Sequence, residues 1–267
     1  MSELISWSHN DGVAHVVLHT RTMSPLFFDR FDQTFSEIEK SEDLRVALIT
    51  SDQKAFSYGL DLQAAFKEHG KILMGAGLAG PRTELLNLIR RWQRAFDRMA
   101  SLPVPVITAI QGWCIGGGLD LISAADIRIA SEDAMFSLRE AAIAIVADLG
   151  SLQRLPSIIG DGQTRHLAFT AEDVTAERAL AMGLVTEVYP SHEALHEAAS
   201  AMARNIASHA PLTIQGVKRV LNFGRGHRSQ DGLDYVAAWN SAFLSSEDLA
   251  EALSAFMSKR KPEFKGR

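Results

Sequence analysis

Three consecutive glycines, Gly116, Gly117 and Gly118, constrain the fold of this 267-residue chain more than any other feature. They follow a run with the character of a buried strand, Val106–Ile110, and precede a run with helical character, residues 119–125. Glycines at a strand-to-helix junction leave backbone N–H groups unobstructed, and the helix dipole favours negative charge there. The segment therefore predicts either a tightly packed turn or a place where an anion is stabilised.

Strand and helix patterns alternate through the first half of the chain. The strands are predicted over residues 13–18, 46–50, 106–110 and 127–130, and the helices over 27–40 and 85–100. Later runs are helical, over 176–182, 192–208, 211–223, 232–243 and 247–259, with one strand over 185–189. This order predicts an α/β core over residues 1–200, followed by a helical region over residues 201–267.

The composition excludes several classes of protein. Apolar residues make up 46% and charged residues 22%, which is typical of a globular chain rather than a disordered one. A net charge of −5 argues against a nucleic-acid binder. The single cysteine fits a reducing compartment, and neither a signal pattern, a membrane-length apolar run nor a Ser-Lys-Leu type ending is present. We therefore expect a cytoplasmic protein that spans no membrane.

Two short motif matches are better explained by chance. Residues 75–80 match the dinucleotide fingerprint G-x-G-x-x-G, but they lie between two helical runs rather than between a strand and a helix. Residues 192–196 match the zinc-protease pattern H-E-x-x-H, but they lie in a polar surface helix and no third ligand follows at a recognised spacing. We predict a flexible loop for the first match and no metal site in the chain.

A second segment, Lys-Ala-Phe-Ser-Tyr-Gly-Leu-Asp-Leu over residues 54–62, follows the buried strand that ends at Thr50. It matches the pattern F-x-x-G-x-D-[LI], and residues 112–121 match G-x-x-x-G-G-G-x-[ED]-[LI]. In this order and at this separation, the two segments resemble the crotonase (enoyl-CoA hydratase/isomerase) superfamily. The resemblance covers nearly the whole chain.

The resemblance implies a crotonase-like ββα spiral core with a helical C-terminal trimerisation region. It implies an oxyanion hole made by the N–H groups of Leu60 and Gly117, which would hold the thioester oxygen of an acyl-CoA. Coenzyme A is then part of the substrate, and no further cofactor is expected. The expected partners are the acyl-CoA, in fatty acid β-oxidation, and further copies of the chain in a homotrimer or homohexamer. The segment expected to contact CoA comprises Ser57, Tyr58, Gly59, Asp61 and Leu62.

Three carboxylates, Asp120, Glu140 and Asp148, lie in apolar stretches of sequence. A buried, unpaired carboxylate is costly, so each needs a solvated edge, a helix to cap or a chemical role; Asp148 in particular could cap a helix. The three acids, with separations of 20 and 8 residues, resemble the pattern of Δ3,5-Δ2,4-dienoyl-CoA isomerases. In enoyl-CoA hydratases the first two positions are usually glutamates and the third is usually glycine.

Moving a double-bond pair from the 3,5 to the 2,4 position takes a proton from C2 and adds one at C6. These carbons are too far apart for one carboxylate to serve both easily. We expect Glu140 to take the C2 proton, Asp148 to deliver to C6 and Asp120 to orient or tune them, with one acid ionised and one neutral. Two alternatives stay open: an enoyl-CoA hydratase or other crotonase-type reaction, and a non-catalytic CoA- or RNA-binding member.

The chain departs from the family pattern in two places. Ser24 and Pro25 stand where Asn-Ala is usual, and Tyr58 is bulky where many relatives have a small residue. Cys114 is expected to be a packed thiol rather than a nucleophile. For the basic residues of 259–265, the resemblance implies a position at a subunit edge rather than contact with nucleic acid.

Overall fold

A six-stranded sheet forms the centre of the computed structural model, which describes residues 3–74, 78–227 and 229–267. Its strands, in spatial order, are β1 (Ile5–Asn10), β2 (Val13–Leu18), β3 (Val46–Ser51), β4 (Val106–Ile110), β6 (Ile127–Ser131) and β9 (Glu187–Tyr189). Strands β1 and β2 form an antiparallel hairpin, and the remaining neighbours are parallel. A smaller sheet follows the order β5 (Trp113–Ile115), β7 (Met135–Ser137), β8 (Asp173–Thr175).

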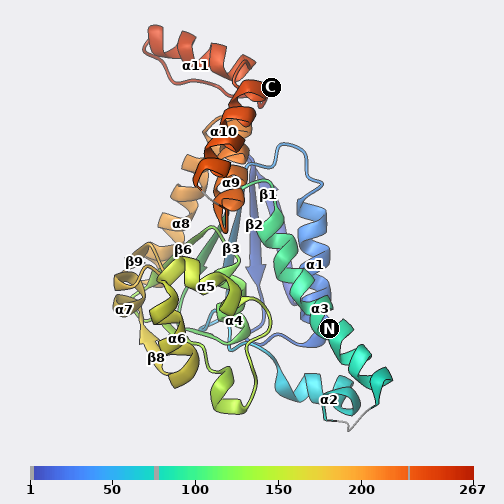
Figure 1. Ribbon diagram of the computed structural model, residues 1–267. Helices are drawn as coiled ribbons and strands as arrows, with labels where there is room; N and C mark the ends of the chain where they lie inside the picture. Colours follow the sequence, from blue (N-terminus) through green and yellow to red (C-terminus); the bar gives the residue numbers. More distant parts are fainter. Residues whose placement is uncertain (1–2, 75–77, 228) are drawn as a thin grey trace.

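Helices cover both faces of the large sheet (Figure 1). On one face, α1 (Pro25–Ile38) packs against α3 (Ala79–Ser101) through an aromatic core, in which the Phe28 and Trp92 rings stack at 5.0 Å. On the other face, α8 (His192–Ala207) lays buried alanines against β3, β4 and β6. Small side chains let this helix approach the sheet closely. Because both faces are covered, the central strands are apolar on both sides.

The unusual Ser24-Pro25 pair has a structural reason. Ser24 is the N-cap of α1, where its hydroxyl accepts a hydrogen bond from the backbone N–H of Phe27 (3.3 Å). Pro25 occupies the first helical turn, where its missing N–H has no cost and its fixed φ is already helical. The departure from the family pattern therefore still starts a helix at this point.

The shorter helices connect the strands and the longer helices along the chain. They are α2 (Leu62–Leu73), α4 (Gly117–Ser123), the 3₁₀ helix η1 (Glu140–Ile143), α5 (Ser151–Ile159), α6 (Asp161–Thr170) and α7 (Ala176–Ala181). Helix α4 leads directly from β5, and it packs against α5. The three acidic residues of the sequence pattern therefore lie on or just before three consecutive helical elements, α4, η1 and α5.

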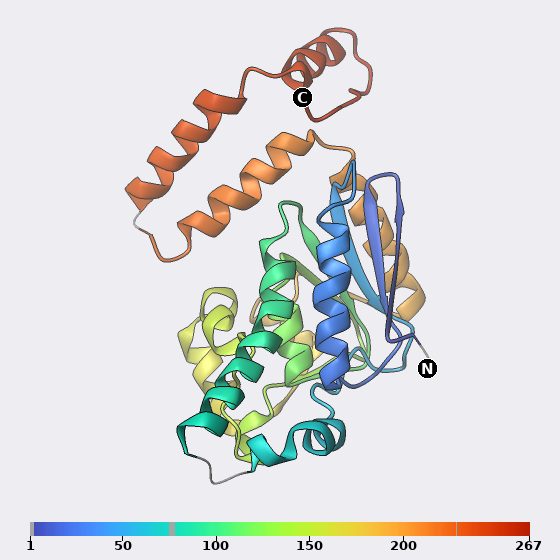
Figure 2. The same cartoon turned by 90° about the vertical axis from the view of Figure 1, so that its right-hand side faces the viewer.

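The last three helices extend beyond one end of the sheet, as Figures 1 and 2 show. They are α9 (Pro211–Gly224), α10 (Ser229–Phe243) and α11 (Glu247–Met257). A buried ion pair fastens α9 to the core, because Lys218 Nζ lies 2.7 Å from Asp126 Oδ2 and donates to the Val104 carbonyl (2.9 Å). The domain boundary predicted at residue 200 falls inside α8 and stays a prediction.

The observed elements confirm the predicted α/β core and helical C-terminal part, with several differences. Strand β1 was not predicted, because its alternation of polar residues is weak at a sheet edge. Helix α3 begins at Ala79, six residues before the predicted start. Of the flexible loop predicted over 75–80, residues 75–77 lie outside the described residues, and the prediction is wrong at Ala79 and Gly80, which begin α3. Helix α2 rather than a strand precedes it, and none of the described helices is long and apolar enough to cross a membrane.

Candidate active site

The two motif segments meet side by side in the structure. The Ser57 N–H donates to the Trp113 carbonyl (2.9 Å), and the Ile115 N–H donates to the Ser57 carbonyl (2.9 Å), which makes a parallel bridge between Ser57 and Cys114. A second short bridge joins Met23 to Leu60. These contacts bring residues 57–61 against the strand that leads into the three glycines.

Gly59 permits this close approach. Its φ of +78° lies in the left-handed region, and a Cβ there would come 2.7 Å from the Ile115 carbonyl oxygen and 2.9 Å from the Gly117 nitrogen. No other residue type fits these two distances. The glycine in the first motif is therefore a packing requirement that places Leu60 next to Gly117.

The backbone N–H groups of Leu60 and Gly117 are available for a ligand. Neither donates a backbone hydrogen bond among the described residues, and Gly117 begins α4, where no earlier helical carbonyl can accept. A Cβ on Gly117 would lie 3.5 Å from the Leu60 nitrogen. Two free donors from separate segments thus line one small space, which is the geometry of an oxyanion hole.

Asp120 lies one turn into α4 with 1% of its surface exposed. Its Oδ1 accepts a hydrogen bond from the backbone N–H of Ser151 (2.7 Å), the first residue of α5. Burial raises the pKa of Asp120 to about 6; the Ser151 hydrogen bonds oppose that rise, and the charge of Asp148 adds to it. The carboxyl group is therefore neither on a solvated edge nor ordinary in its proton affinity.

Glu140 begins η1 and points its carboxyl at the glycine turn. Its Oε1 would lie 3.0 Å from a Cβ on Gly116, whose φ is +52°. Its Oε2 is buried without a hydrogen-bond partner. Burial raises the pKa of Glu140 to about 7, and the charges of Asp120 and Asp148 add to the rise. This carboxyl is a stronger proton acceptor than an ordinary glutamate and lies beside the glycine turn that carries the free Gly117 N–H.

Asp148 lies between two buried residues, Ala147 and Leu149, just before α5. Burial raises the pKa of its carboxyl group, and its own backbone N–H opposes the rise. Its predicted alternative role as a helix cap is wrong, since the N-cap of α5 is Gly150. The pKa of each of the other two acids responds to the charge of Asp148, so the structure brings the three predicted acids together.

The segment predicted to contact CoA contains both buried and exposed residues. Ser57 is buried, and its hydroxyl accepts from the Gly59 N–H (3.0 Å). Tyr58 and Leu62 expose 43% and 37% of their surface. Asp61 caps α2 through the Ala64 N–H (2.9 Å). These contacts explain the local turn, and a role in binding CoA stays a prediction.

Two residues of chemical interest do not join the site. Cys114 is fully buried, and burial together with the charge of Asp120 raises the pKa of its thiol well above the usual value, which favours a packed thiol over a nucleophile. His192, from the H-E-x-x-H match, lies 2.9 Å from an Asp133 oxygen on the surface. In the described ranges, no group of three or more His, Cys, Asp or Glu side chains is arranged to hold a metal ion.

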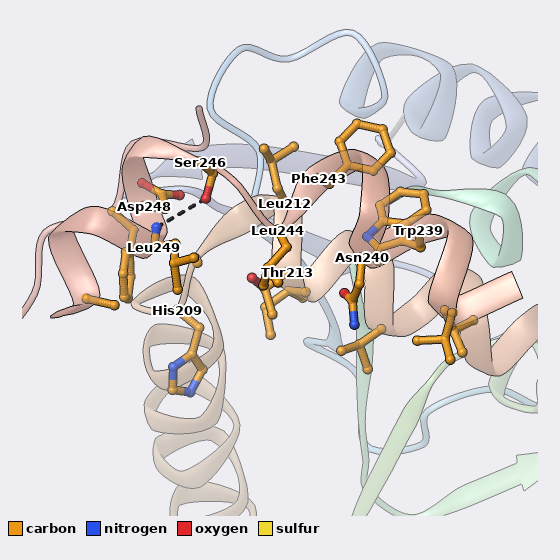
Figure 3. A pocket seen from close by; sticks show the side chains of 18 of the residues that line it. His209, Leu212, Thr213, Trp239, Asn240, Phe243, Leu244, Ser246, Asp248 and Leu249 are labelled. Atoms are coloured by element: carbon orange, nitrogen blue, oxygen red, sulfur yellow. Dashed lines mark hydrogen bonds between the residues drawn. The ribbon is translucent and has the colours of Figure 1, made fainter. Parts of the chain in front are cut away.

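A cavity of about 600 Å³ lies elsewhere, among α9, α10 and α11 (Figure 3). Its lining is mostly apolar, with Trp239, Phe243 and Leu244 from α10 and the loop after it facing Leu212 of α9. None of the three acids lines it. The three acids and the two free backbone donors therefore form a separate group of residues, away from this cavity.

Sequence reasoning missed the residues that hold the acids in place. Gln93 of α3 donates from Nε2 to the Asp148 carbonyl oxygen (2.6 Å), and Arg154 of α5 donates to the Leu149 carbonyl (3.2 Å). Local sequence patterns do not predict a hydrogen bond between residues 55 positions apart. The contact between Gln93 and Asp148 therefore becomes visible only in the folded structure.

The chain is similar to one described family and to several individual proteins. The family described as enoyl-CoA hydratase/isomerase matches residues 8–267. A peroxisomal Δ(3,5)-Δ(2,4)-dienoyl-CoA isomerase from Arabidopsis thaliana is 40% identical over 98% of this chain and 96% of its own. A mitochondrial one from Dictyostelium discoideum is 38% identical over 91% of this chain and 83% of its own. The crystal structure of an enoyl-CoA hydratase from Bacillus anthracis superposes with a TM-score of 0.89, at 28% identity, over 99% of this chain and all of its own.

Proposed function

The chain belongs to the enoyl-CoA hydratase/isomerase family, and from this premise we propose that it is a Δ3,5-Δ2,4-dienoyl-CoA isomerase acting in fatty acid β-oxidation. The observation that carries the proposal is the set of three carboxylates, Asp120, Glu140 and Asp148, all with raised pKa values, beside two free backbone donors. Similarity to relatives named as such isomerases over most of their length supports it.

The free N–H groups of Leu60 and Gly117 would bind the thioester oxygen of a 3,5-dienoyl-CoA. Loss of a C2 proton moves negative charge onto this oxygen and along the conjugated carbons to C6. Donors fixed where charge develops contribute about 10²–10³ in rate each in a site that excludes water. The glycine-lined turn would therefore stabilise the dienolate, but it would not determine which carbon is protonated.

Glu140 would remove the C2 proton. Its Oε1 lies beside Gly116, the residue before Gly117, which supports a role next to the thioester. With a pKa of about 7, a large fraction is ionised near neutral pH, and the conjugate acid is weak enough to make it an effective base.

Asp148 would give its proton to C6. Burial favours its neutral form, as a proton donor requires. After the reaction Glu140 holds the C2 proton and Asp148 is ionised, so the starting state returns when Glu140 releases a proton to solvent and Asp148 takes one up from solvent. Asp120, whose pKa responds to the charge of Asp148, would tune this exchange.

Hydration of an enoyl-CoA is the second candidate function. The similarity to an enoyl-CoA hydratase structure favours it, since two acids beside an oxyanion hole could also activate water. Asp148 would then be incidental. Its position among Ala147 and Leu149, in a segment held by Gln93, supports the isomerase instead.

A direct assay separates these functions. Purified protein is given a 3,5-dienoyl-CoA and, separately, crotonyl-CoA. We expect a conjugated 2,4-dienoyl chromophore to form from the first and only slow loss of the enoyl absorbance from the second. Rapid hydration of crotonyl-CoA with no dienoyl conversion would refute the isomerase. Tight RNA binding with no turnover of either thioester would support a non-catalytic member of the fold.

We propose that the chain forms a homotrimer or homohexamer through its C-terminal helices. Helix α10 has no buried residue, and apolar side chains of α11 are open to solvent, with Phe256 and Met257 more than 80% exposed. Such apolar helices need a covering surface. Sedimentation equilibrium tests this: a monomer at micromolar concentration would contradict it.

The remaining expectations are part of the same proposal. No cofactor is needed beyond the CoA carried by the substrate, and no nucleic acid takes part. The cytoplasm predicted from the sequence contrasts with relatives that are named peroxisomal and mitochondrial. Cell fractionation with an antibody would decide between these compartments.

A further inference from the structure

We infer that Gln93 is a positioning residue that aims the proton donor Asp148 at C6. The inference rests on the proposed function and extends it, since it concerns how one of the three acids is held. Gln93 lies on α3, outside both sequence motifs, and donates from Nε2 to the Asp148 carbonyl oxygen at 2.6 Å.

The carboxyl group of Asp148 has no side-chain partner that could orient it. In the part of the chain that the structure describes, no other side chain forms a hydrogen bond or ion pair with it, and its own backbone N–H is the hydrogen bond that affects its pKa. Asp120 differs, because the Ser151 N–H holds its Oδ1 directly. The direction of the Asp148 side chain is therefore set by its backbone, and Gln93 holds that backbone.

The segment around Asp148 is a transition from exposed to buried chain. Residues 141–146 are exposed, whereas Ala147 and Leu149 are each 6% exposed. Consecutive carbonyls are then held by side chains: Gln93 binds that of Asp148, and Arg154 binds that of Leu149.

Helix α3 supports both side chains that bind these carbonyls, Gln93 and Arg154. Gln93 donates to the loop directly, and Asp97, one turn further along, lies 2.5 Å from the guanidinium of Arg154. Helix α3 also packs against α1 through its aromatic core, so it is a rigid element of the fold. An acid on an otherwise exposed loop thus takes its position from a long, well-packed helix.

Loss of the Gln93 donor should affect one half of the reaction more than the other. The Asp148 carbonyl would lose its partner, and the peptide could rotate and carry the carboxyl away from C6. Among the described residues, Gln93 forms no hydrogen bond with Glu140 or with the N–H groups of Leu60 and Gly117, so removal of the C2 proton should continue. A displacement of about 1 Å can reduce the rate of a step by about 100-fold.

The test uses Gln93→Met, which keeps the length and removes the donor, and Gln93→Lys, which keeps a donor. Arg94→Met, at an exposed neighbouring position on α3, is the matched control. Each full-length protein is incubated with a 3,5-dienoyl-CoA in D₂O. Formation of the conjugated product and deuterium exchange at C2 of the remaining substrate are measured together, with thermal unfolding as the check on folding.

We expect Gln93→Met to lower product formation by at least about tenfold, while C2 exchange stays within about threefold of the wild type. Gln93→Lys should recover part of the loss, and Arg94→Met should match the wild type. Equal loss of both activities, or no loss of either, would overturn the inference. If Gln93→Met does not fold, Gln93→Glu makes the same comparison, since its carboxylate accepts and cannot donate at pH 8.

The two proposals fail in different ways. Wild-type protein that forms no 2,4-dienoyl product would refute the proposed function itself. If the wild type is active, and the ratio of C2 exchange to product formation is the same in Gln93→Met as in the wild type, only the positioning role is refuted.

Discussion

Replacing Asp120 with asparagine should make the folded protein more stable at pH 8 while lowering its activity. The ionised carboxyl is 1% exposed and lies near Glu140 and Asp148, so its charge is held at a cost in folding free energy. Asparagine removes the charge, keeps the volume and keeps an oxygen that can accept from the Ser151 N–H. Groups poised for chemistry often destabilise the fold in this way.

The magnitude follows from the pKa of Asp120. A rise from the ordinary 3.8 to about 6 corresponds to about 3 kcal/mol, at about 1.4 kcal/mol for each tenfold change in proton affinity. Because the folded-state pKa of Asp120 is raised, the contribution of this group to stability is fully present below pH 3.8 and is lost as the pH rises through about 6. Since an amide oxygen accepts a hydrogen bond less strongly than a carboxylate, the expected gain at pH 8 is about 2–3 kcal/mol.

The assay is urea unfolding at one protein concentration, at several pH values from 4 to 8, for the wild type, Asp120→Asn and Asp43→Asn. Asp43 is exposed with a φ of +56°, which asparagine tolerates, so it reports the effect of removing a surface charge. The difference in the free energy of unfolding between Asp120→Asn and the wild type should be near zero at pH 4 and should grow toward pH 7. A variant less stable than the wild type at pH 8, or an advantage independent of pH, would refute the reasoning.

Three further substitutions test the roles of the other groups. Asp148→Asn should reduce dienoyl-CoA isomerisation by at least about 100-fold, because it removes the C6 proton donor, and intact activity would show that Asp148 has no such role. The kcat of the wild type should rise with pH through about 7 as Glu140 ionises, and Glu140→Gln should abolish that dependence along with C2 exchange in D₂O. Gly116→Ala should lower kcat by about tenfold, since its Cβ would lie 3.0 Å from Glu140 Oε1. Gly162→Ala, with open space at its Cβ, serves as the control, and equal rates for the two alanine variants would contradict the proposed geometry.

The close approach of the two motif segments was predictable from sequence, because it depends on local backbone. The glycines of the two motifs indicate where segments must approach closely, and the structure shows why: a Cβ at Gly59 would overlap the Ile115 carbonyl. The acids Asp120, Glu140 and Asp148 are notable as carboxylates in apolar sequence, and the resemblance to dienoyl-CoA isomerases implied their role as a set. Their raised pKa values in the structure agree with that reasoning.

The supporting contacts could not be predicted, because they join residues that are distant in the sequence. Gln93 reaches Asp148 across 55 residues, and Lys218 reaches Asp126 across 92. The capping role considered for Asp148 failed for a related reason: the turn before α5 uses Gly150 in a left-handed conformation, and the Ser151 N–H is satisfied by Asp120 from another helix. Tertiary contacts replaced the local cap that the sequence pattern suggests.

The position of deuterium in the product tests the central claim most directly. The wild-type protein is incubated with a 3,5-dienoyl-CoA in D₂O, and the 2,4-dienoyl product is examined by NMR and mass spectrometry. Transfer from C2 to C6 through Glu140 and Asp148 predicts one deuterium at C6 and none at C3. A product that carries a C3 hydroxyl group, or deuterium at C4 in place of C6, would contradict the account.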